Sequence, residues 1–404
     1  SGGVEGGPGG TEDTAAVTST EAPTLSTGAM ATTLESATEA TTLTTDALTT
    51  TTEPLPEYPD CGYSVVPLLE IDDESVRPIA GDIDGDGDAD IMAIGHTNVQ
   101  PGGDTLTLWR AEGKTYVLED SRELSWSNKH FLAEVGGEPG LELIVTSVID
   151  IDPGNEFEFR AEVYRWTDWA GPGFPAPVVT IHDAGSDSVR VADLDGDGRA
   201  DLYTLSGYPA TVGIWLGAGD GSFIHAQTIE TFGCYVNDVI VVDLDHDGSS
   251  DLVTVGDCNT SITDPPLVLH RGGVDGFGPP EVIGNVSGIT FYLRAGRFNA
   301  DPWDDVLYFS EYGESIAIAE ADGDGALSLP WIYPLANPGG QVIDLDQDGL
   351  SDILRGTSRL RGTGSWFEGC SFSPVAVSAI DLDGSPPLEL LARDGSAVFA
   401  LVGP

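Results

Sequence analysis

The stretch Asp193–Leu205, DLDGDGRADLYTL, places acidic residues at alternate positions directly before a short apolar run. Asp stands at its first, third, fifth and ninth positions, and Gly at its sixth. The same spacing of acids recurs from Asp82 (DIDGDGDADIMAI), Asp243 (DLDHDGSSDLVTV) and Asp344 (DLDQDGLSDIL). Weaker copies begin at Glu134 (EVGGEPGLELIV), Arg297 (RFNADPWDDVLYF) and Asp381 (DLDGSPPLELLA). Seven copies spaced about 50 residues apart are typical of a supersecondary unit that stacks on copies of itself.

Each repeat reads as four short strands separated by turns rich in Gly and Asp. In the repeat that contains Asp193, the expected strands are Ser188–Ala192, Asp201–Leu205, Thr211–Leu216 and Phe223–Thr228. Short strands at this spacing indicate all-β structure. Seven such units predict a seven-bladed β-propeller with four-stranded antiparallel blades, a closed ring that leaves only short sheet edges.

The two ends of the repeat region indicate how the ring closes. The last unit supplies only three strands, Val375–Ile380, Leu388–Ala392 and Ala397–Val402. The stretch Tyr63–Glu70 (YSVVPLLE) precedes the first unit and has no partner strands of its own. We therefore expect residues 63–70 to complete the seventh blade, so that the propeller spans residues 61–404.

Residues 1–60 differ in composition from the rest of the chain. They are rich in Thr, Ala, Gly and Glu, contain no Lys or Arg, and include one aromatic residue, Tyr58. Such a segment cannot bury enough apolar surface to offset its chain entropy, so we predict a disordered stalk. Its Thr clusters suit either an O-glycosylated stalk or an unmodified spacer. The opening SGGVEGG would suit the linker that follows the lipid-bearing cysteine of a bacterial lipoprotein.

The charge balance is strongly acidic. The chain has 16 basic and 67 acidic residues, a formal net charge of −51. This surface repels phosphate backbones and anionic headgroups, which argues against nucleic-acid partners and against electrostatic docking on membranes. No apolar run approaches the roughly 18 residues of a membrane-spanning helix. We expect an extracellular or cell-surface protein, tethered through its stalk or, as a further alternative, an outer-membrane lipoprotein.

The spacing of the acids points to a metal. Alternate carboxylates in a tight loop turn inward together, and hard oxygen ligands suit Ca²⁺ better than Zn²⁺ or copper. The first six positions also resemble an EF-hand loop, which requires a Glu at position twelve. That position holds Ala93, Thr204, Thr254 or Arg355, and a strand pattern follows each loop. The loops are therefore expected between two strands.

The repeat resembles the FG-GAP repeat of integrin α-subunits and their bacterial, VCBS-type relatives. The resemblance covers Cys61 to Pro404 and implies about four Ca²⁺ ions, one in each strong loop between the first two strands of a blade. In each loop four carboxylates and the carbonyl of the seventh residue would be ligands. The implied residues are Asp82, Asp84, Asp86, Asp88 and Asp90; Asp193, Asp195, Asp197, Arg199 and Asp201; Asp243, Asp245, Asp247, Ser249 and Asp251; and Asp344, Asp346, Asp348, Leu350 and Asp352.

The three weak copies depart from this pattern. Arg297 replaces the first Asp, so Asn299, Asp301 and Asp305 make a poor site. Asp381, Asp383 and Glu389 keep three carboxylates but lose the Gly, which predicts a weaker site. The copy at Glu134 has Gly136 at its third position, and we expect no ion there.

The four cysteines suit a disulfide-bonded propeller. Cys234 and Cys258 are equally distant from His246, the middle residue of the third strong loop. Residues at equal distances across a hairpin face each other, which predicts a Cys234–Cys258 disulfide. Cys61 and Cys370 remain, and their bond would lock the ring closure. Two disulfides indicate an oxidising compartment, and four free thiols are the alternative.

Known catalytic motifs are missing. The sequence has no GxSxG, HExxH, P-loop or Rossmann glycine motif, and its six His form no metal-spaced pair. We expect a non-enzymatic module for protein interaction or adhesion. A carbohydrate-binding lectin is the first alternative, and a polysaccharide-degrading lyase or hydrolase is the second. The ranking of these functions rests on analogy, because one fold serves many functions.

Overall fold

The structure is a computed structural model. It describes residues 59–71, 77–96, 104–113, 115–124, 127–137, 139–152, 156–165, 176–182, 188–207, 210–231, 235–257, 266–273, 275–285, 290–310, 315–328, 330–334, 340–365, 367–380, 388–395 and 397–403. Residue contacts divide the chain into two units, Ser1–Pro54 and Leu55–Pro404. The predicted stalk, residues 1–60, lies almost wholly outside the described residues, and it stays a prediction.

The described strands form seven four-stranded sheets, antiparallel throughout. The first three are β2 (Arg77–Gly81), β3 (Asp90–His96), β4 (Asp104–Glu112) and β5 (Thr115–Leu124); β6 (Ser127–Ala133), β7 (Glu142–Asp152), β8 (Glu156–Tyr164) and β9 (Val179–His182); and β10 (Ser188–Ala192), β11 (Asp201–Gly207), β12 (Ala210–Gly217) and β13 (Phe223–Glu230). In the described part of the chain, no helix is long and apolar enough to cross a membrane.

The remaining four sheets follow the same plan. They are β14 (Tyr235–Val242), β15 (Asp251–Asp257), β16 (Pro266–His270) and β17 (Glu281–Asn285); β18 (Thr290–Gly296), β19 (Asp305–Ser310), β20 (Ser315–Ala319) and β21 (Trp331–Pro334); β22 (Gln341–Ile343), β23 (Asp352–Arg355), β24 (Ser358–Gly362) and β25 (Phe367–Ser371); and β26 (Val375–Ile380), β27 (Glu389–Asp394), β28 (Ala397–Val402) and β1 (Ser64–Glu70).

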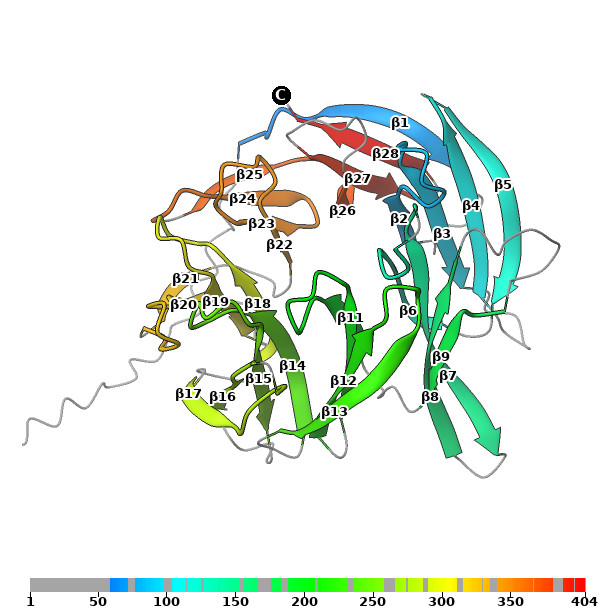
Figure 1. Ribbon diagram of the computed structural model, residues 1–404. Helices are drawn as coiled ribbons and strands as arrows, with labels where there is room; N and C mark the ends of the chain where they lie inside the picture. Colours follow the sequence, from blue (N-terminus) through cyan, green and yellow to red (C-terminus); the bar gives the residue numbers. More distant parts are fainter. Residues whose placement is uncertain are drawn as a thin grey trace, which may run out of the picture. The chain divides into compact units, whose positions relative to one another are not determined.

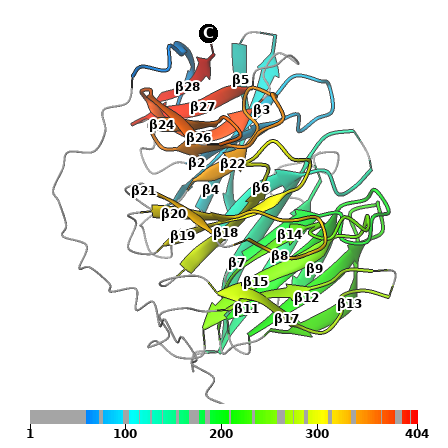
Figure 2. The same cartoon turned by 90° about the vertical axis from the view of Figure 1, so that its left-hand side faces the viewer.

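The seven sheets are the blades of a propeller. Figure 1 shows them set around a common centre, and Figure 2 shows the same sheets from the side. First strands of neighbouring blades contact one another: β2 contacts β6 and β26, and β18 contacts β14 and β22. The first strands therefore line the centre of the ring. This arrangement confirms the seven-bladed fold expected from the repeats.

The apolar core lies between neighbouring blades. Val253 of β15 packs with Leu293 and Val306 of the fifth blade. Leu252, its neighbour in the same strand, packs with Val212 of the third blade. Since successive side chains of a strand point to opposite faces, β15 buries one face against each neighbouring blade. This two-sided burial explains why the second strands are continuous apolar runs in the sequence.

The last blade confirms the predicted ring closure. Strand β1 pairs antiparallel with β28, from Ser64 opposite Val402 to Glu70 opposite Ala397. The predicted Cys61–Cys370 disulfide is present, with Cα atoms 4.9 Å apart. The disulfide ties the segment before β1 to β25 of the sixth blade. The N-terminal strand is therefore held both by its pairing with β28 and by this bond. Cys234 and Cys258 lie outside the described residues, and their disulfide stays a prediction.

Candidate metal centres

Contacts join the acidic loops of neighbouring blades. Each loop joins the first strand of a blade to its second strand, as the sequence predicted. Neighbouring loops are hydrogen-bonded to each other. The Leu141 N–H donates to the Asp82 carbonyl at 2.9 Å, and the Ser250 hydroxyl donates to the Asp193 carbonyl at 2.9 Å. Order in one loop is therefore linked to order in the next blade.

The loop 193–201 is folded by its own carboxylates. The two oxygens of Asp193 accept hydrogen bonds from the N–H groups of Gly196 (2.8 Å) and Gly198 (2.9 Å). Asp197 accepts a hydrogen bond from the Arg199 N–H at 2.9 Å. Both glycines have positive φ, 76° and 83°, a conformation that glycine adopts without steric cost. The backbone of this loop wraps around the acids at its first, third and fifth positions.

All four strong loops share this backbone. The first Asp accepts a hydrogen bond from the sixth-position N–H of Gly87, Gly198, Gly248 or Gly349, at 2.8 to 3.1 Å. The loops differ at the fourth position, where the first two have glycine. The third and fourth loops place His246 (φ 55°) and Gln347 (φ 56°) in the left-handed region. Those two residues carry a steric cost that glycine avoids.

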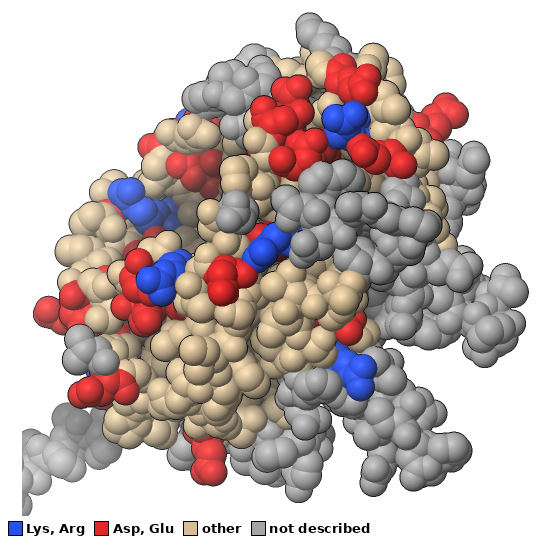
Figure 3. Space-filling model, turned by 45° about the vertical axis from the view of Figure 1, so that its right-hand side comes forward, with Lys and Arg blue, Asp and Glu red and all other residues tan. Residues whose placement is uncertain are grey.

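The structure brings carboxylate oxygens together in each strong loop. In every group, one ligand atom from each of three acids lies within 4.8 Å of the others. The groups are Asp82, Asp84 and Asp86; Asp193, Asp195 and Asp197; Asp243, Asp245 and Asp251; and Asp344, Asp346 and Asp348. On the face drawn in Figure 3, acidic side chains form several separate patches, and basic side chains lie beside some of them. Carboxylates this close repel each other unless a cation lies near.

The donor set fits a hard cation. Asp243 Oδ1 is buried and has no hydrogen-bond partner in the structure. A buried acceptor without a partner is costly, and a cation in the loop would satisfy it. Carboxylate oxygens, with the seventh-position carbonyl, are the ligands that Ca²⁺ prefers over softer donors. The residues of these loops therefore fit the ion that the repeat implies.

The ninth acid has a role that the sequence interpretation missed. Asp201 is 1% exposed, and its two oxygens accept hydrogen bonds from the N–H groups of Leu194 and Gly217, both at 2.7 Å. It thus holds the start of the loop to the end of the third strand, β12. The same pair of bonds occurs at Asp305, from Phe298 (3.1 Å) and Ala321 (3.0 Å), although Arg297 has replaced the first acid there.

Burial changes the titration of the ninth acids. It raises the pKa of Asp90 to about 6, against the hydrogen bonds from Ala111 and Ile83, which lower it. It raises the pKa of Asp305 likewise to about 6. One sequence signal could have revealed this structural role of the ninth acid. An acid stands at the ninth position in all seven copies, including Glu142 and Glu389 of the weak ones. A residue that persists where the other ligands are lost has a structural use of its own.

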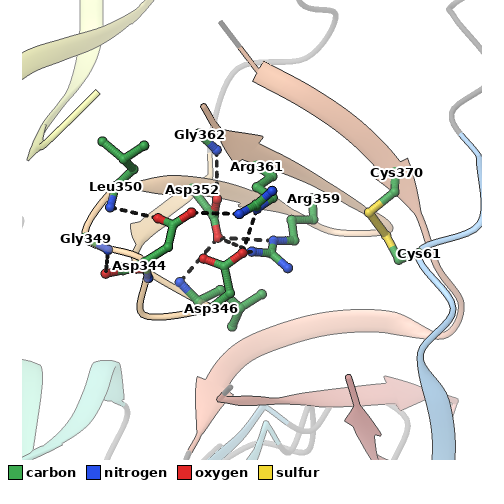
Figure 4. Close-up of polar contacts among 12 residues, drawn as sticks. Cys61, Asp344, Asp346, Gly349, Leu350, Asp352, Arg359, Arg361, Gly362 and Cys370 are labelled. Carbon is green, nitrogen blue, oxygen red and sulfur yellow. Dashed lines mark hydrogen bonds and ion pairs between the residues drawn. A yellow bond between two sulfur atoms is a disulfide. The ribbon is translucent and has the colours of Figure 1, made fainter. Parts of the chain in front are cut away.

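The fourth strong loop, 344–352, differs in the cations beside it. Two arginines of β24 reach its acids, and Figure 4 shows both side chains pointing toward the loop. Arg361 donates to Asp346 Oδ2 and to Asp348 Oδ2, each at 2.7 Å. Arg359 Nη2 lies 2.8 Å from Asp346 Oδ2 and 2.6 Å from Asp352 Oδ2. Three of the loop's four acids therefore have a guanidinium partner.

The arginines change the pKa of the third-position acid, as a comparison of Asp84 with Asp346 shows. Burial raises the pKa of Asp84, and the charge of Asp86 adds to the rise. Burial alone would also raise the pKa of Asp346, but the hydrogen bond from Arg361 and the charge of Arg359 lower it below its usual value. The first carboxylate sits in an excess of negative charge. The second sits beside compensating positive charge.

Strand register shows which residues of the other blades correspond to these arginines. Each ninth acid lies opposite one residue of the third strand, because Leu202 pairs with Trp215 and Ile353 pairs with Leu360. In the blade whose loop begins at Asp193, Leu216 of β12 thus corresponds to Arg361, and Ile214 of β12 corresponds to Arg359. The residues that correspond to Arg361 in the other six blades are Arg110, Arg165, Leu216, Arg271, Glu320 and Val402. Those that correspond to Arg359 are Leu108, Val163, Ile214, Leu269, Ile318 and Ala400.

The weak copies agree with their sequence in the described residues. Arg297 Nη2 donates to the Asp301 carbonyl at 3.0 Å, so a guanidinium has taken the place of the first acid. At the Glu134 copy, Glu142 accepts hydrogen bonds from Val135 (3.0 Å) and Gly136 (3.1 Å). Asp381 and Asp383 lie outside the described residues, whereas Glu389 is buried. The weaker site expected at Asp381 stays a prediction.

A comparison with protein families supports the repeat. Residues 193–254 match the family model of the FG-GAP-like repeat. A search of curated protein sequences found no match. Similar solved structures include an Agrocybe aegerita lectin that recognises non-reducing terminal N-acetylglucosamine (18% identity, TM-score 0.47, 79% of this chain and 82% of the lectin covered). A Bacillus licheniformis rhamnogalacturonan lyase (14%, 0.48, 84% and 75%) and the WD40 domain of Toxoplasma gondii coronin (11%, 0.48, 84% and 89%) are also similar.

The blades, the acidic loops and the family match point to one kind of protein. The matched segment contains two of the four strong loops, three strands of the third blade, and the first strand and part of the second strand of the fourth blade. The same loop geometry recurs at Asp82 and Asp344, outside the matched segment. The chain is therefore a seven-bladed β-propeller that contains FG-GAP-like repeat sequence at residues 193–254.

Proposed function

We propose that the protein binds calcium in its acidic loops and acts outside the cell as a module for protein interaction or adhesion. The observation that carries the calcium proposal is the grouping of three carboxylates within 4.8 Å in each strong loop. The grouped acids are the first, third and fifth in three of the loops, and the first, third and ninth in the loop 243–251. These acids would hold the ion, with the carbonyl of the seventh residue. At the third loop, the unpartnered buried oxygen of Asp243 supports the same assignment.

The role of calcium in this proposal is structural. Bound calcium supplies positive charge that offsets the repulsion among the acids. The loops are hydrogen-bonded from blade to blade, so order in each loop supports the packing of the next blade. Extracellular sites bind calcium at roughly 10⁻⁴–10⁻³ M. At tenfold excess over the dissociation constant, each site adds about 1.4 kcal/mol to the free energy of unfolding.

A location outside the cytosol is supported by the disulfide. Cys61 and Cys370 are bonded, and such bonds persist in oxidising compartments. Calcium is also plentiful there, which suits sites of modest affinity. The net charge of −51 favours partners that are neutral or basic over nucleic acid.

The interaction proposal is supported by the way the ring is closed. Strand β1 completes the last blade, and the disulfide holds the adjoining segment. A closed ring presents its end loops on a rigid support, which suits a recognition surface better than a mobile one. We propose no catalytic activity for this chain.

The test has two parts. Metal analysis of the full chain, equilibrated with calcium and freed of unbound ion, should find several calcium ions, and chelation should lower the melting temperature. A chain that binds none contradicts the calcium proposal. Arrays of extracellular proteins and of glycans should then give calcium-dependent binding on the protein array. Binding confined to the glycan array would favour a lectin, and turnover of a polysaccharide would favour an enzyme.

A further inference from the structure

We propose that Arg359 and Arg361 take the place of calcium in the loop 344–352, so that this loop is closed without an ion. The inference rests on the proposed calcium binding of the other loops and specifies which of them use it. It assigns calcium to the loops that begin at Asp82, Asp193 and Asp243. The fourth loop has the same sequence motif but carries its own cations.

The geometry at the fourth loop is that of an occupied site. The Asp346 Oδ2 oxygen receives Arg361 Nε at 2.7 Å and Arg359 Nη2 at 2.8 Å. The Asp348 Oδ2 oxygen receives Arg361 Nη2 at 2.7 Å. For calcium to bind these two oxygens, both guanidinium contacts would have to break. Asp346 Oδ1 is buried without a partner, as Asp243 Oδ1 is in the third loop, so the two loops differ in their guanidinium contacts and not in this oxygen.

Arg359 cannot withdraw to make room. Its side chain is 13% exposed, and its partner Asp352 is 1% exposed. Moving the guanidinium away would leave a buried carboxylate without its cation, which is strongly destabilising. Arg361 is the more exposed of the two, at 44%, but it contacts both Asp346 and Asp348. The pair therefore acts as a fixed internal cation.

The corresponding residues of the other loops explain why those sites stay open to an ion. At the loop 193–201 they are Ile214 and Leu216, which bring no charge. At the loop 82–90 the residue that corresponds to Arg361 is Arg110, whose guanidinium pairs instead with Glu112 (3.4 Å) and Glu119 (2.9 Å).

The third loop is intermediate. Arg271 pairs with Asp245, and it also lies 3.4 Å from Glu281, outside the loop. The position that corresponds to Arg359 is the buried Leu269, so no second guanidinium is available. Asp243 Oδ1 is buried and without a partner. One arginine on one acid compensates less of this loop's negative charge than two arginines on three acids do in the fourth loop, so the third loop keeps a need for calcium.

The position of the arginine-closed loop matters for the whole ring. It belongs to the sixth blade, whose fourth strand, β25, contains Cys370. The ring-closing region would thus be stabilised by arginines and a disulfide, neither of which depends on calcium. Loss of calcium would loosen the first, third and fourth blades and leave the closure in place.

The first experiment compares two matched substitutions. D344N and D193N remove the same first-position charge from the fourth and the second loop. Calcium per chain is counted by equilibrium dialysis with metal analysis. We expect D193N to lose about one ion and D344N to lose none. The result is the difference in calcium ions per chain between each variant and the wild type, because the weaker loop at Asp381 can add an ion to the total of every chain.

The second experiment exchanges the third-strand residues. L216R places a guanidinium beside the second loop and should remove about one ion, while R359I/R361L should add about one at the fourth loop. R361L alone, at the more exposed arginine, serves if the double variant does not fold. I332R is the control, because Ile332 is 61% exposed in β21 of the fifth blade, whose loop lacks the first acid, so the count should not change.

The outcomes separate the two proposals. A wild-type chain that binds no calcium contradicts the proposed function. Calcium binding that falls by one ion in D344N, as in D193N, leaves the proposed function standing and overturns the inference. An unchanged count in R359I/R361L, or in R361L where that variant is used, also overturns it. Retained calcium in D344N together with a gained ion on removal of the arginines supports it.

Discussion

The loops 193–201 and 344–352 share a motif, a backbone and a buried ninth acid, yet they differ in what balances their charge. In both, the first Asp accepts the N–H of the sixth-position glycine, Gly198 or Gly349, at 2.8 to 2.9 Å. The difference lies in the third strand of the blade, where one has aliphatic residues and the other has two arginines. The motif therefore determines the shape of the loop, whereas a strand outside the motif determines its cation.

The largest expected effect is that of calcium removal. Three sites at about 1.4 kcal/mol each would contribute roughly 4 kcal/mol to the free energy of unfolding. Chelation should lower the melting temperature of the wild-type chain. The drop should be smaller in D193N, which has lost one site, and unchanged in D344N. Calorimetry in calcium and in EGTA measures this. An equal reduction in both variants would remove the distinction between the two loops.

Arg359→Ala should be almost as damaging in EGTA. It leaves Asp352, which is 1% exposed, without its cation, and breaking such a pair costs about 3 kcal/mol. Millimolar calcium should restore part of the loss, because the variant loop offers its acids to an ion. The matched control is Ile214→Ala, which opens a core cavity at the corresponding position and costs about 2–4 kcal/mol. Calcium should not restore that loss, and equal behaviour of the two variants in urea unfolding would refute the distinction.

The third-position acids should respond to pH with opposite signs in calcium-free solution. The pKa of Asp84 is raised by burial and by Asp86, so its contribution to stability is fully present below the usual carboxyl pKa and is lost as pH rises through the folded value. The pKa of Asp346 is lowered, because Arg361 and Arg359 outweigh burial. Its contribution is present above the usual pKa and is lost as pH falls through the folded value. Carboxyl carbon NMR of both side chains across pH 3–7 checks the two directions, and shifts of the same sign would contradict them.

The smallest expected effect concerns the fourth loop position. Gln347 has a φ of 56°, where glycine carries no steric cost. Gln347→Gly should stabilise the fourth loop by up to about 1 kcal/mol, and Gly196→Ala should destabilise the second loop by a similar amount. Thermal melts in EGTA measure both changes. A destabilising Gln347→Gly would show that the side chain has contacts that outweigh its backbone cost.

The sequence predicted the ring and its closure because these depend on local patterns. Alternating acids, glycines and apolar runs specify each hairpin. The missing strand of the last unit identified Tyr63–Glu70 as its partner, and the structure has this strand at Ser64–Glu70. The Cys61–Cys370 bond followed from the same closure and is confirmed. Cys234–Cys258 stays a prediction, testable by mass spectrometry of non-reduced peptides.

The sequence did not predict the arginines beside Asp346. Arg359 and Arg361 lie 13 and 15 residues from that acid, and only the register of β23 with β24 brings them to it. The sequence also did not predict that both oxygens of Asp201 accept hydrogen bonds from backbone N–H groups, while its predicted role as an ion ligand stays a prediction. Contacts that depend on pairing between strands are not encoded in the spacing of a motif.

Hydrogen–deuterium exchange of the full wild-type chain, with and without calcium, tests the central claim most directly. Peptides that cover residues 82–90, 193–201 and 243–251 should exchange slowly with calcium and faster in EGTA, since the N–H groups of their glycines are held by the acids. The peptide that covers residues 344–352 should be equally protected in both, because its arginines remain. A fourth loop that loses protection together with the other three would contradict the account.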